Sequence, residues 1–336
     1  MAHILLKHIA EEAGVSVTTV SFVLNGKAKE KRISDAIIEK VEKIIEANNF
    51  KPNAFAKGLR TGKTATIALI VEDIGNAFFA NIAKKIELIA YKKGYKVVFA
   101  STDNNELKAK ELLELMRSQH VDGLIVIPTP GLRPSILQLT QKKVPIILFD
   151  RYFEDVPTNY VILDNFQGSY KMTQALIKSG KRKIGFVTID SKMTQMVERL
   201  EGYRQCLIDH SIPYDEDRVM VFPHISPIQI DPAFMEARFR AQPDLDAIFF
   251  ATNYLGILGL ECLNNLNKSI PSDIGVASFD DHDLFRLFRP PISVVAQPIE
   301  DLANAAIEML LNQISNESIQ TKQVRVMPQI IIRNSF

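Results

Sequence analysis

Residues 4–25 read ILLKHIAEEAGVSVTTVSFVLN, and this pattern predicts two short helices joined by a tight turn at Gly14. Ser16 is placed to cap the second helix, since its hydroxyl oxygen can accept a hydrogen bond from an otherwise free amide of the first turn. Apolar residues recur at the helical period on one face of the first helix, at Leu6, Ile9, Ala10 and Ala13. The two helices are therefore expected to share a small apolar core.

The second helix has an apolar inner face and a mostly polar outer face. By their spacing its residues divide into an inner set, Val20, Val23 and Leu24, and an outer set, Val17, Thr18, Ser21 and Phe22. An amphipathic segment over residues 34–47 supplies a third helix that covers the pair. Three short helices in this order are typical of a helix-turn-helix unit, which lays its second helix in the major groove of DNA. A purely structural role for the second helix is the alternative.

The segment after the third helix, residues 49–63, reads NFKPNAFAKGLRTGK. Pro52 ends the preceding helix, and Asn53 is placed to cap a further turn or two through Leu59. The segment has no acidic residue and carries Lys51, Lys57, Arg60 and Lys63. An exposed leucine on such a basic turn suits a wedge that unstacks a base step in the minor groove. This segment favours DNA binding over a structural role.

Two runs in this region resemble the LacI/GalR-type bacterial repressors. They are Ala-Gly-Val-Ser-x-x-Thr-Val-Ser over residues 13–21 and Pro-Asn-Ala-x-Ala-x-x-Leu-Arg over residues 52–60. The resemblance continues over essentially the whole chain, through ERLEGY at 198–203, FFATN at 249–253 and SFDD at 278–281. Together with the helix faces, it identifies these candidate DNA-contacting residues: Ser16, Val17, Thr18, Thr19, Ser21, Phe22, Asn25, Asn53, Ala56, Lys57, Leu59 and Arg60.

Three positions depart from the family pattern. Phe22 stands where the family usually has a polar or basic groove-reading residue, which bears on the operator sequence. Tyr254 follows Asn253 where an acidic residue is usual, which bears on the identity of the effector. Leu5 replaces the usual hydroxyl cap, so a slightly frayed first helix is expected.

The composition of the 336-residue chain limits the classes of function. Residues 1–63 hold eleven Lys and Arg against seven Asp and Glu, whereas the whole chain has a net charge of +1, which leaves −3 for residues 64–336. This asymmetry places any nucleic-acid contact in the N-terminal part. Two cysteines, Cys206 and Cys262, form no disulfide or zinc framework and fit a reducing cytoplasm. We expect neither a signal peptide nor a membrane span.

The sequence predicts no catalytic or metal-binding constellation. Gly62-Lys63-Thr64 resembles the end of a phosphate loop, but Lys57 stands where the first glycine would be. Asp280 and Asp281 have no neighbouring nucleophile or base, and the six histidines are scattered without metal-ligand spacing. The chain is therefore predicted to be a binding protein rather than an enzyme, without a cofactor or a metal.

From Thr64 onward, apolar β-branched runs alternate with amphipathic helical segments. Strands that are apolar along their length are buried on both faces, which indicates parallel, doubly wound sheets, and the number of runs favours two sheets. The last run, residues 324–332, is expected to be a single strand. The predicted fold class is an all-α helix-turn-helix domain with a hinge helix, followed by an α/β body.

The resemblance implies boundaries for these parts. It implies a DNA-binding domain over 1–49, a hinge helix over 50–63 and an effector-binding and dimerisation domain over 64–336. The last domain would have two lobes, like the periplasmic sugar-binding proteins, with crossovers near 161–164, 290–293 and 321–324. The N-lobe would comprise about 64–161 and 293–322, and the C-lobe about 163–291 and 324–336.

Polar residues follow the ends of several predicted strands, where parallel sheets bind ligands. Acids and amides there, with nearby aromatic rings, suit a polyhydroxylated ligand with a stacking face. For Asp73 and Asn76 a turn or cap role is an equal alternative. Arg199 is added because the resemblance places it in the cleft. The candidate effector-binding residues are Asp73, Asn76, Phe78, Phe79, Asp150, Arg151, Arg199, Asn253 and Asp280.

These features predict a cytoplasmic, nucleoid-associated, ligand-responsive repressor of a carbohydrate-utilisation operon. It would bind a pseudo-palindromic operator as a homodimer, because dimer and DNA share a two-fold axis. The resemblance implies a sugar or sugar phosphate as the effector. Alternatives are a nucleoside or purine effector, a protein corepressor, or a sugar-binding protein without a regulatory role.

Overall fold

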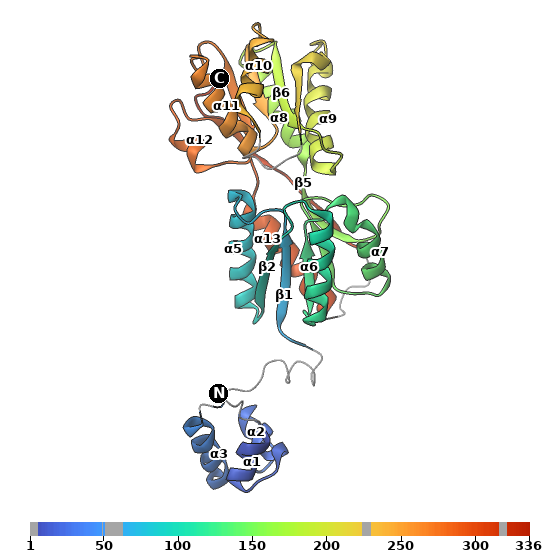
Figure 1. Ribbon diagram of the computed structural model, residues 1–336, viewed down its shortest axis with the longest axis vertical. Coiled ribbons are helices and arrows are strands. Elements are labelled where there is room, and N and C mark those ends of the chain that lie inside the picture. Colours follow the sequence, from blue (N-terminus) through green and yellow to red (C-terminus); the bar gives the residue numbers. More distant parts are fainter. Residues whose placement is uncertain (1–5, 49, 51–62, 224–229, 316–320) are drawn as a thin grey trace. The chain divides into compact units, whose positions relative to one another are not determined.

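The computed structural model describes residues 6–48, 50, 63–223, 230–315 and 321–336. It divides into two compact units, Met1–Ala65 and Thr66–Phe336, which we call the head and the body (Figure 1). The predicted hinge-helix contacts lie outside the described residues and stay predictions: Asn53, Ala56, Lys57, Leu59 and Arg60.

The head consists of α1 (Leu6–Ala13), α2 (Val17–Leu24) and α3 (Asp35–Ala47). Each helix contributes one fully buried residue to a shared core: Ile9, Val20 and Val41. Gly14 makes the turn at a φ of +68°, where a side chain would be strained. The Ser16 hydroxyl accepts a 3.0 Å hydrogen bond from the Thr19 amide, as its predicted capping role requires. The predicted helical head is confirmed.

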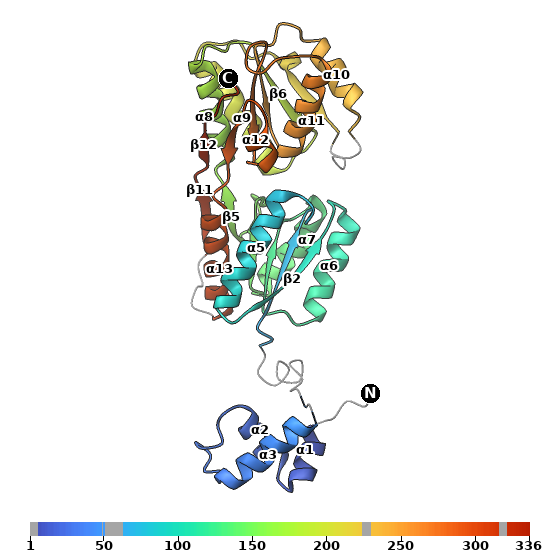
Figure 2. The same cartoon turned by 90° about the vertical axis from the view of Figure 1, so that its left-hand side faces the viewer.

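One lobe of the body, the N-lobe, is built on a parallel six-stranded sheet in the order β11-β5-β4-β3-β1-β2. Two helices, α5 and α13, cover one face, and α6 and α7 cover the other (Figure 2). The elements are β1 (Thr66–Val71), α5 (Ala77–Lys92), β2 (Lys96–Ser101), α6 (Glu106–Ser118), β3 (Gly123–Val126), α7 (Arg133–Gln141), β4 (Ile146–Phe149), β5 (Asn159–Leu163), α13 (Ile299–Ile314) and β11 (Gln323–Val326).

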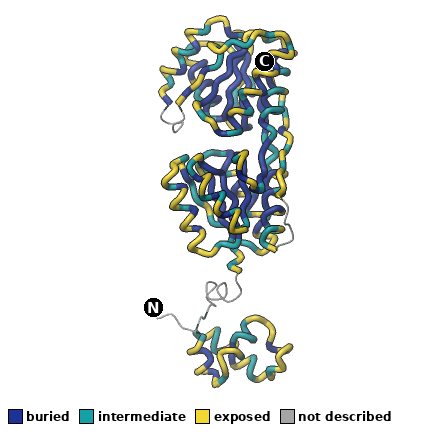
Figure 3. Tube along the Cα trace, turned by 90° about the vertical axis from the view of Figure 1, so that its right-hand side faces the viewer, coloured by how far each residue is buried: buried dark blue, intermediate teal, exposed yellow. Residues whose placement is uncertain are grey.

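The other lobe, the C-lobe, has a six-stranded sheet in the order β12-β10-β9-β8-β6-β7, parallel except for the antiparallel edge strand β12. The inner strands of both sheets are largely buried, whereas the edge strands, β2 and β11 in the N-lobe and β7 and β12 in the C-lobe, are partly exposed (Figure 3). The elements are α8 (Asn165–Lys178), β6 (Ile184–Ile189), α9 (Thr194–Asp209), β7 (Val219–Phe222), α10 (Pro232–Arg240), β8 (Ala247–Phe250), α11 (Asn253–Asn265), β9 (Gly275–Phe279), α12 (Asp283–Leu287), β10 (Ser293–Ala296) and β12 (Gln329–Ile331). The predicted two-sheet α/β body is confirmed.

The structure corrects where the chain passes between the lobes. The run expected to be one strand over 324–332 is two strands, because β11 pairs with β5 in the N-lobe and β12 pairs with β10 in the C-lobe. The third passage is therefore at residues 327–328, not near 321–324. The second follows β10 at residues 297–298, not near 290–293, since β10 pairs with β9 in the C-lobe sheet. The first follows β5, at Asp164.

Candidate functional site

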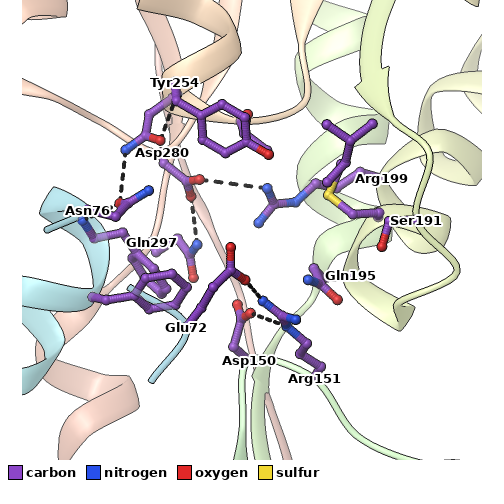
Figure 4. Close-up of a pocket in the computed structure, with 16 residues that line it drawn as sticks. Glu72, Asn76, Asp150, Arg151, Ser191, Gln195, Arg199, Tyr254, Asp280 and Gln297 are labelled. Atoms are coloured by element: carbon purple, nitrogen blue, oxygen red, sulfur yellow. Dashed lines mark hydrogen bonds and ion pairs between the residues drawn. The ribbon is translucent and has the colours of Figure 1, made fainter. Parts of the chain in front are cut away.

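A cleft in the body lies between the facing carboxyl ends of the two sheets (Figure 4). It encloses about 510 Å³ of space, counted out to its open mouth. Its lining includes eight of the nine predicted effector residues, from both lobes: Asn76, Phe78, Phe79, Asp150, Arg151, Arg199, Asn253 and Asp280. The ninth, Asp73, does not line it. The Asp73 carboxylate instead accepts a 2.8 Å hydrogen bond from the Gly75 amide and stabilises a turn.

Arg199 is held by the interior of the C-lobe, and 3% of its surface is exposed. Its Nε donates to Asn165 Oδ1 at 2.9 Å, and its Nη1 donates to the Ala251 carbonyl at 2.7 Å. The guanidinium lies 4.0 Å from the centre of the Phe279 ring, a cation–π contact. Nη1 is also 3.7 Å from Asp280 Oδ2. The arginine is thus fixed in position at the wall of the cleft without any ligand.

Asp150 and Asp280 hold matching positions in the two lobes. Each follows a strand that ends in phenylalanine, and each has a left-handed backbone, with φ of +66° and +64°. Aspartate tolerates this conformation better than most residues. The turn directs both carboxylates into the cleft, where Gln297 Nε2 donates to Asp280 Oδ1 at 2.6 Å (Figure 4).

Arg151 is the second buried arginine, with 2% of its surface exposed. It forms an ion pair with Glu72 and donates through Nη1 to Asn104 Oδ1 at 3.1 Å. Its Nε lies 3.5 Å from Asp150 Oδ2 and makes no hydrogen bond to another described residue. Burial lowers the pKa of Arg151 to about 10.

The same burial acts on the neighbouring carboxyl. It raises the pKa of Asp150 to about 7, although the positive charge of Arg199 opposes the shift; the negative charge of Asp280 adds to it. Asp150 therefore changes charge near neutral pH. The cleft consequently holds two guanidiniums and three carboxylates, one of which is poised between its two protonation states.

One side-chain contact crosses the cleft from lobe to lobe. Asn253 Nδ2, at the start of α11, lies 3.4 Å from Asn76 Oδ1, at the start of α5. Asn76 Oδ1 also accepts a 2.9 Å hydrogen bond from the Phe78 amide. Asn76 therefore both caps a helix and lines the cleft. The two alternatives for this residue do not exclude each other.

Several lining residues were not among the predicted set. Glu72 follows the first strand directly, so the signal that indicated Asp73 applied equally to it. Gln195 lies one helical turn before Arg199 on α9, and its Oε1 is buried without a hydrogen-bond partner among the described residues. The others are Ile189, Ser191, Met196, Thr252, Tyr254 and Gln297.

The predicted DNA-contacting residues of the head lie on α2 and at its two ends. Val17 is 43% exposed, Ser16, Thr18 and Asn25 are exposed, and Thr19, Ser21 and Phe22 are half-buried. Asn25 Nδ2 donates to the Ser21 carbonyl at 2.6 Å, so Asn25 also closes the helix. The Lys31 ammonium lies 5.6 Å from the centre of the Phe22 ring. Base contacts by these residues remain predictions.

The described part of the chain contains no group of three or more His, Cys, Asp or Glu residues that could hold a metal ion. It also contains no helix long and apolar enough to cross a membrane.

Comparisons with known proteins cover both units. Residues 5–53 match "Bacterial regulatory proteins, lacI family", and residues 173–336 match a periplasmic binding protein-like domain. The sucrose operon repressor of Lactococcus lactis subsp. lactis is 32% identical over 322 residues, which are 94% of this chain and 95% of that protein. The ribose operon repressor of Haemophilus influenzae is 28% identical over 98% of both chains.

Solved structures show the same architecture. A complex of the transcriptional regulator CelR with cellobiose matches with a TM-score of 0.72 at 27% identity, over 99% of this chain and 100% of that one. The lac repressor dimer bound to operator and an anti-inducer matches with a TM-score of 0.85, over 99% of both chains. That pair is 20% identical, so it supports the fold alone.

Proposed function

The chain belongs to the lacI family of bacterial regulatory proteins, and from this membership we propose that it represses a carbohydrate-utilisation operon until a neutral, unphosphorylated sugar binds in the cleft. The family assigns it DNA binding and ligand-responsive transcriptional regulation. The protein would act in the cytoplasm through reversible binding of effector and operator, and it would catalyse no reaction.

The observation that carries the effector class is the charge pairing in the cleft. Each lining guanidinium already has a carboxylate partner, Glu72 for Arg151 and Asp280 for Arg199, and Asp150 adds a third carboxylate. Among the described residues, the cleft lining contains no other arginine and no lysine. A phosphate would therefore enter a site without an unpaired cation. Sugar hydroxyls, which both donate and accept, suit paired charges and amides.

Aromatic rings in the lining support the same ligand class. Phe78 and Phe79 meet edge to face, with their centres 5.0 Å apart, at the start of α5. Both also line the cleft. An apolar ring wall opposite buried charges suits a sugar, which has a polar rim and an apolar face.

A homodimer is proposed from an apolar groove on the C-lobe between α11 and α12. Leu284 is 49% exposed and Leu287 is 70% exposed, and Ile257, Leu260 and Phe288 complete the apolar lining. Apolar side chains gathered at the surface mark an interaction site. A second copy would bury this surface and present two heads to the half-sites of a pseudo-palindromic operator. Leu287→Arg should convert the dimer to monomers in sedimentation velocity.

The first test of the proposed function measures operator binding by fluorescence anisotropy, using DNA from upstream of the gene. The affinity should fall steeply with salt, since each neutralised phosphate adds about 0.9 to the log–log slope. A slope near zero would contradict DNA binding through the basic head.

Phe22→Ala should change the base preference in a binding selection, because an aromatic ring contacts a thymine methyl but cannot pair with a guanine edge.

The second test adds a panel of neutral sugars, their phosphates and nucleosides to the same complex. We expect one neutral sugar to release the wild-type protein and to leave Arg199→Ala on the operator. Arg204→Ala, a change at an exposed site on the same helix, is the matched control. Release by a sugar phosphate or a nucleoside alone would overturn the proposed effector class. A response only in the presence of another protein would indicate a corepressor.

A further inference from the structure

A third arginine, Arg325, contacts the residues that are adjacent in sequence to the two cleft arginines. Arg325 Nη1 donates to Glu198 Oε1 at 2.9 Å, and its Nη2 donates to Tyr152 Oη at 2.9 Å. Glu198 immediately precedes Arg199 on α9 of the C-lobe, and Tyr152 immediately follows Arg151 in the N-lobe. One planar guanidinium therefore contacts one residue from each lobe.

On the N-lobe side, ring packing and a hydrogen bond hold Tyr152 in place. The Arg325 guanidinium lies 5.7 Å from the centre of the Tyr152 ring, and that ring packs 4.4 Å from the ring of Tyr160 on β5. Tyr160 Oη in turn donates to Gln323 Oε1 at 3.1 Å, on the same strand as Arg325. Tyr152 is thus tied to two adjacent strands, β5 and β11, so its position relative to Arg325 is fixed.

The C-lobe side depends on charge. Only 19% of the Glu198 side chain is exposed, and its Oε2 is buried without a hydrogen-bond partner among the described residues. Burial raises the pKa of Glu198, and the charge of Arg325 is the largest opposing influence. Without Arg325 this partly buried carboxylate would lose its opposite charge, which would favour a shift of α9 toward water.

The arrangement sits where the lobes are joined. β11 ends at Val326 and β12 begins at Gln329, so Arg325 lies next to the third passage between the lobes. Asp164, at the first passage, also acts on the charge of Glu198. β5 and β11 run side by side as they approach the C-lobe (Figure 2). A rotation of one lobe against the other must therefore change the distances from Arg325 to Glu198 and to Tyr152.

We propose that Arg325 is a positioning residue that sets the spacing between Arg151 and Arg199 and thereby the affinity of the cleft for its effector. Arg325 does not line the cleft. It acts through Tyr152 and Glu198, each one residue away from a cleft arginine. A sugar held by both lobes binds best when the two guanidiniums are already at the bound spacing, because less ordering is then required on binding. The effector in this statement rests on the proposed function.

The ligand test uses isothermal titration calorimetry of the full-length wild type with ribose, cellobiose and sucrose. The sugar that binds most tightly is then titrated into each variant. Arg325→Gln should weaken the binding of that sugar about tenfold. Arg325→Lys, which keeps the charge but not the fork, should restore part of the loss. Adding Glu198→Gln to Arg325→Gln should restore part of the binding, because it removes the carboxylate charge that Arg325→Gln leaves without a partner. Arg133→Gln, which breaks the Arg133–Asp155 pair within the N-lobe, is the matched control and should have no effect.

A ligand-free measurement keeps the inference separate from the effector class. Spin labels at exposed positions of the two lobes, Lys110→Cys on α6 and Lys171→Cys on α8, report the distance between the lobes, since the native cysteines are buried. Labelled chains are diluted with unlabelled ones so that only distances within a chain are read. Arg325→Gln should broaden the distance distribution, and Arg133→Gln should not.

The outcomes separate two failures. If no sugar binds the wild type but Arg325→Gln broadens the distribution, the proposed effector class fails and the positioning role stands. If a sugar binds and both its affinity and the distribution are unchanged in Arg325→Gln, the positioning role is overturned. A lower melting temperature with unchanged sugar affinity would make Arg325 a stabilising residue only, which also overturns it.

Discussion

Asp150 and Asp280 have the same backbone setting but different electrostatic environments. Both follow a strand-terminal phenylalanine, both have a left-handed backbone, and both amides donate to a valine carbonyl on the adjacent strand. Asp280 then meets Arg199 at 3.7 Å and receives a hydrogen bond from Gln297. Among the described residues, Asp150 forms an ion pair with the Nε edge of Arg151, at 3.5 Å, while the other end of that guanidinium is paired with Glu72 and Asn104. Arg199 acts on its charge without a close contact.

The difference shows how two lobes with similar strand ends contribute differently to one cleft. In the C-lobe, Arg199 comes from a separate helix and is held by Asn165 and the Ala251 carbonyl, so it meets Asp280 in a fixed geometry. In the N-lobe, burial raises the pKa of Asp150 to about 7. We therefore expect the C-lobe to supply most of the binding free energy and the N-lobe to supply the pH response.

Removal of the Arg199 side chain tests the contribution of the C-lobe and should have the largest effect. Arg199→Ala leaves Asp280 buried with one partner fewer, and breaking a buried pair in this way costs about 3–5 kcal/mol of unfolding free energy. Urea unfolding of the wild type, Arg199→Ala and the exposed control Arg204→Ala measures this cost. A loss no greater than that of the control would remove the contrast between the lobes.

The two aspartates can be compared directly by titration with the effector. Asp280→Asn should cost about 2 kcal/mol of binding free energy, since it removes the charge that faces Arg199 in a fixed geometry. Asp150→Asn should cost about 1 kcal/mol or less, because the native side chain is partly protonated at neutral pH. Equal losses would show that the two lobes contribute equally.

The pH dependence of stability isolates Asp150. Its folded pKa of about 7 lies above its ordinary value of 3.8, so the folded state binds this proton more tightly than the unfolded state does. The resulting stabilisation is fully present below pH 3.8 and is lost as pH rises through 7, by at most about 4 kcal/mol at 1.36 kcal/mol per pKa unit. Asp150→Asn, which resembles the protonated form, should be more stable than the wild type at pH 8. Parallel stability curves for the two proteins between pH 5 and pH 8 would count against a titrating Asp150.

Tyr254 should show the smallest effect of the series. Burial raises the pKa of its hydroxyl, and the residue lines the cleft directly after Asn253. Tyr254→Phe keeps the ring and removes one hydrogen-bonding group, so it should weaken the binding free energy of the effector by about 1 kcal/mol. Competition titrations should also show whether the variant changes the order of preference among sugars. An unchanged affinity and an unchanged order would exclude a role for the hydroxyl in ligand choice.

Local patterns predicted the head and the strand ends well. The cap at Ser16 and the turn at Gly14 depend on contacts within a few residues, so the sequence contains all that they need. Asp150, Asn253 and Asp280 were found because parallel strands present their carboxyl ends at one edge of a sheet. Asp73 met the same criterion, yet its side chain bonds to the Gly75 amide two residues later. A local turn and a ligand contact look alike in sequence.

The helical head, the alternation of strands and helices, and the polar character of the strand ends could be predicted from the residues alone, because they follow from the hydrophobic period and from local hydrogen bonding. The sheet that each strand joins could not be predicted in this way, because strand pairing depends on contacts between distant segments. The run over 324–332 is interrupted by Pro328 and Gln329, but nothing local indicates that its two halves join different sheets. The meeting of Arg325 with Glu198 and Tyr152 was equally unpredictable, since these residues are 127 and 173 positions apart from it in sequence. Such contacts arise from lobe packing, which sequence spacing does not encode.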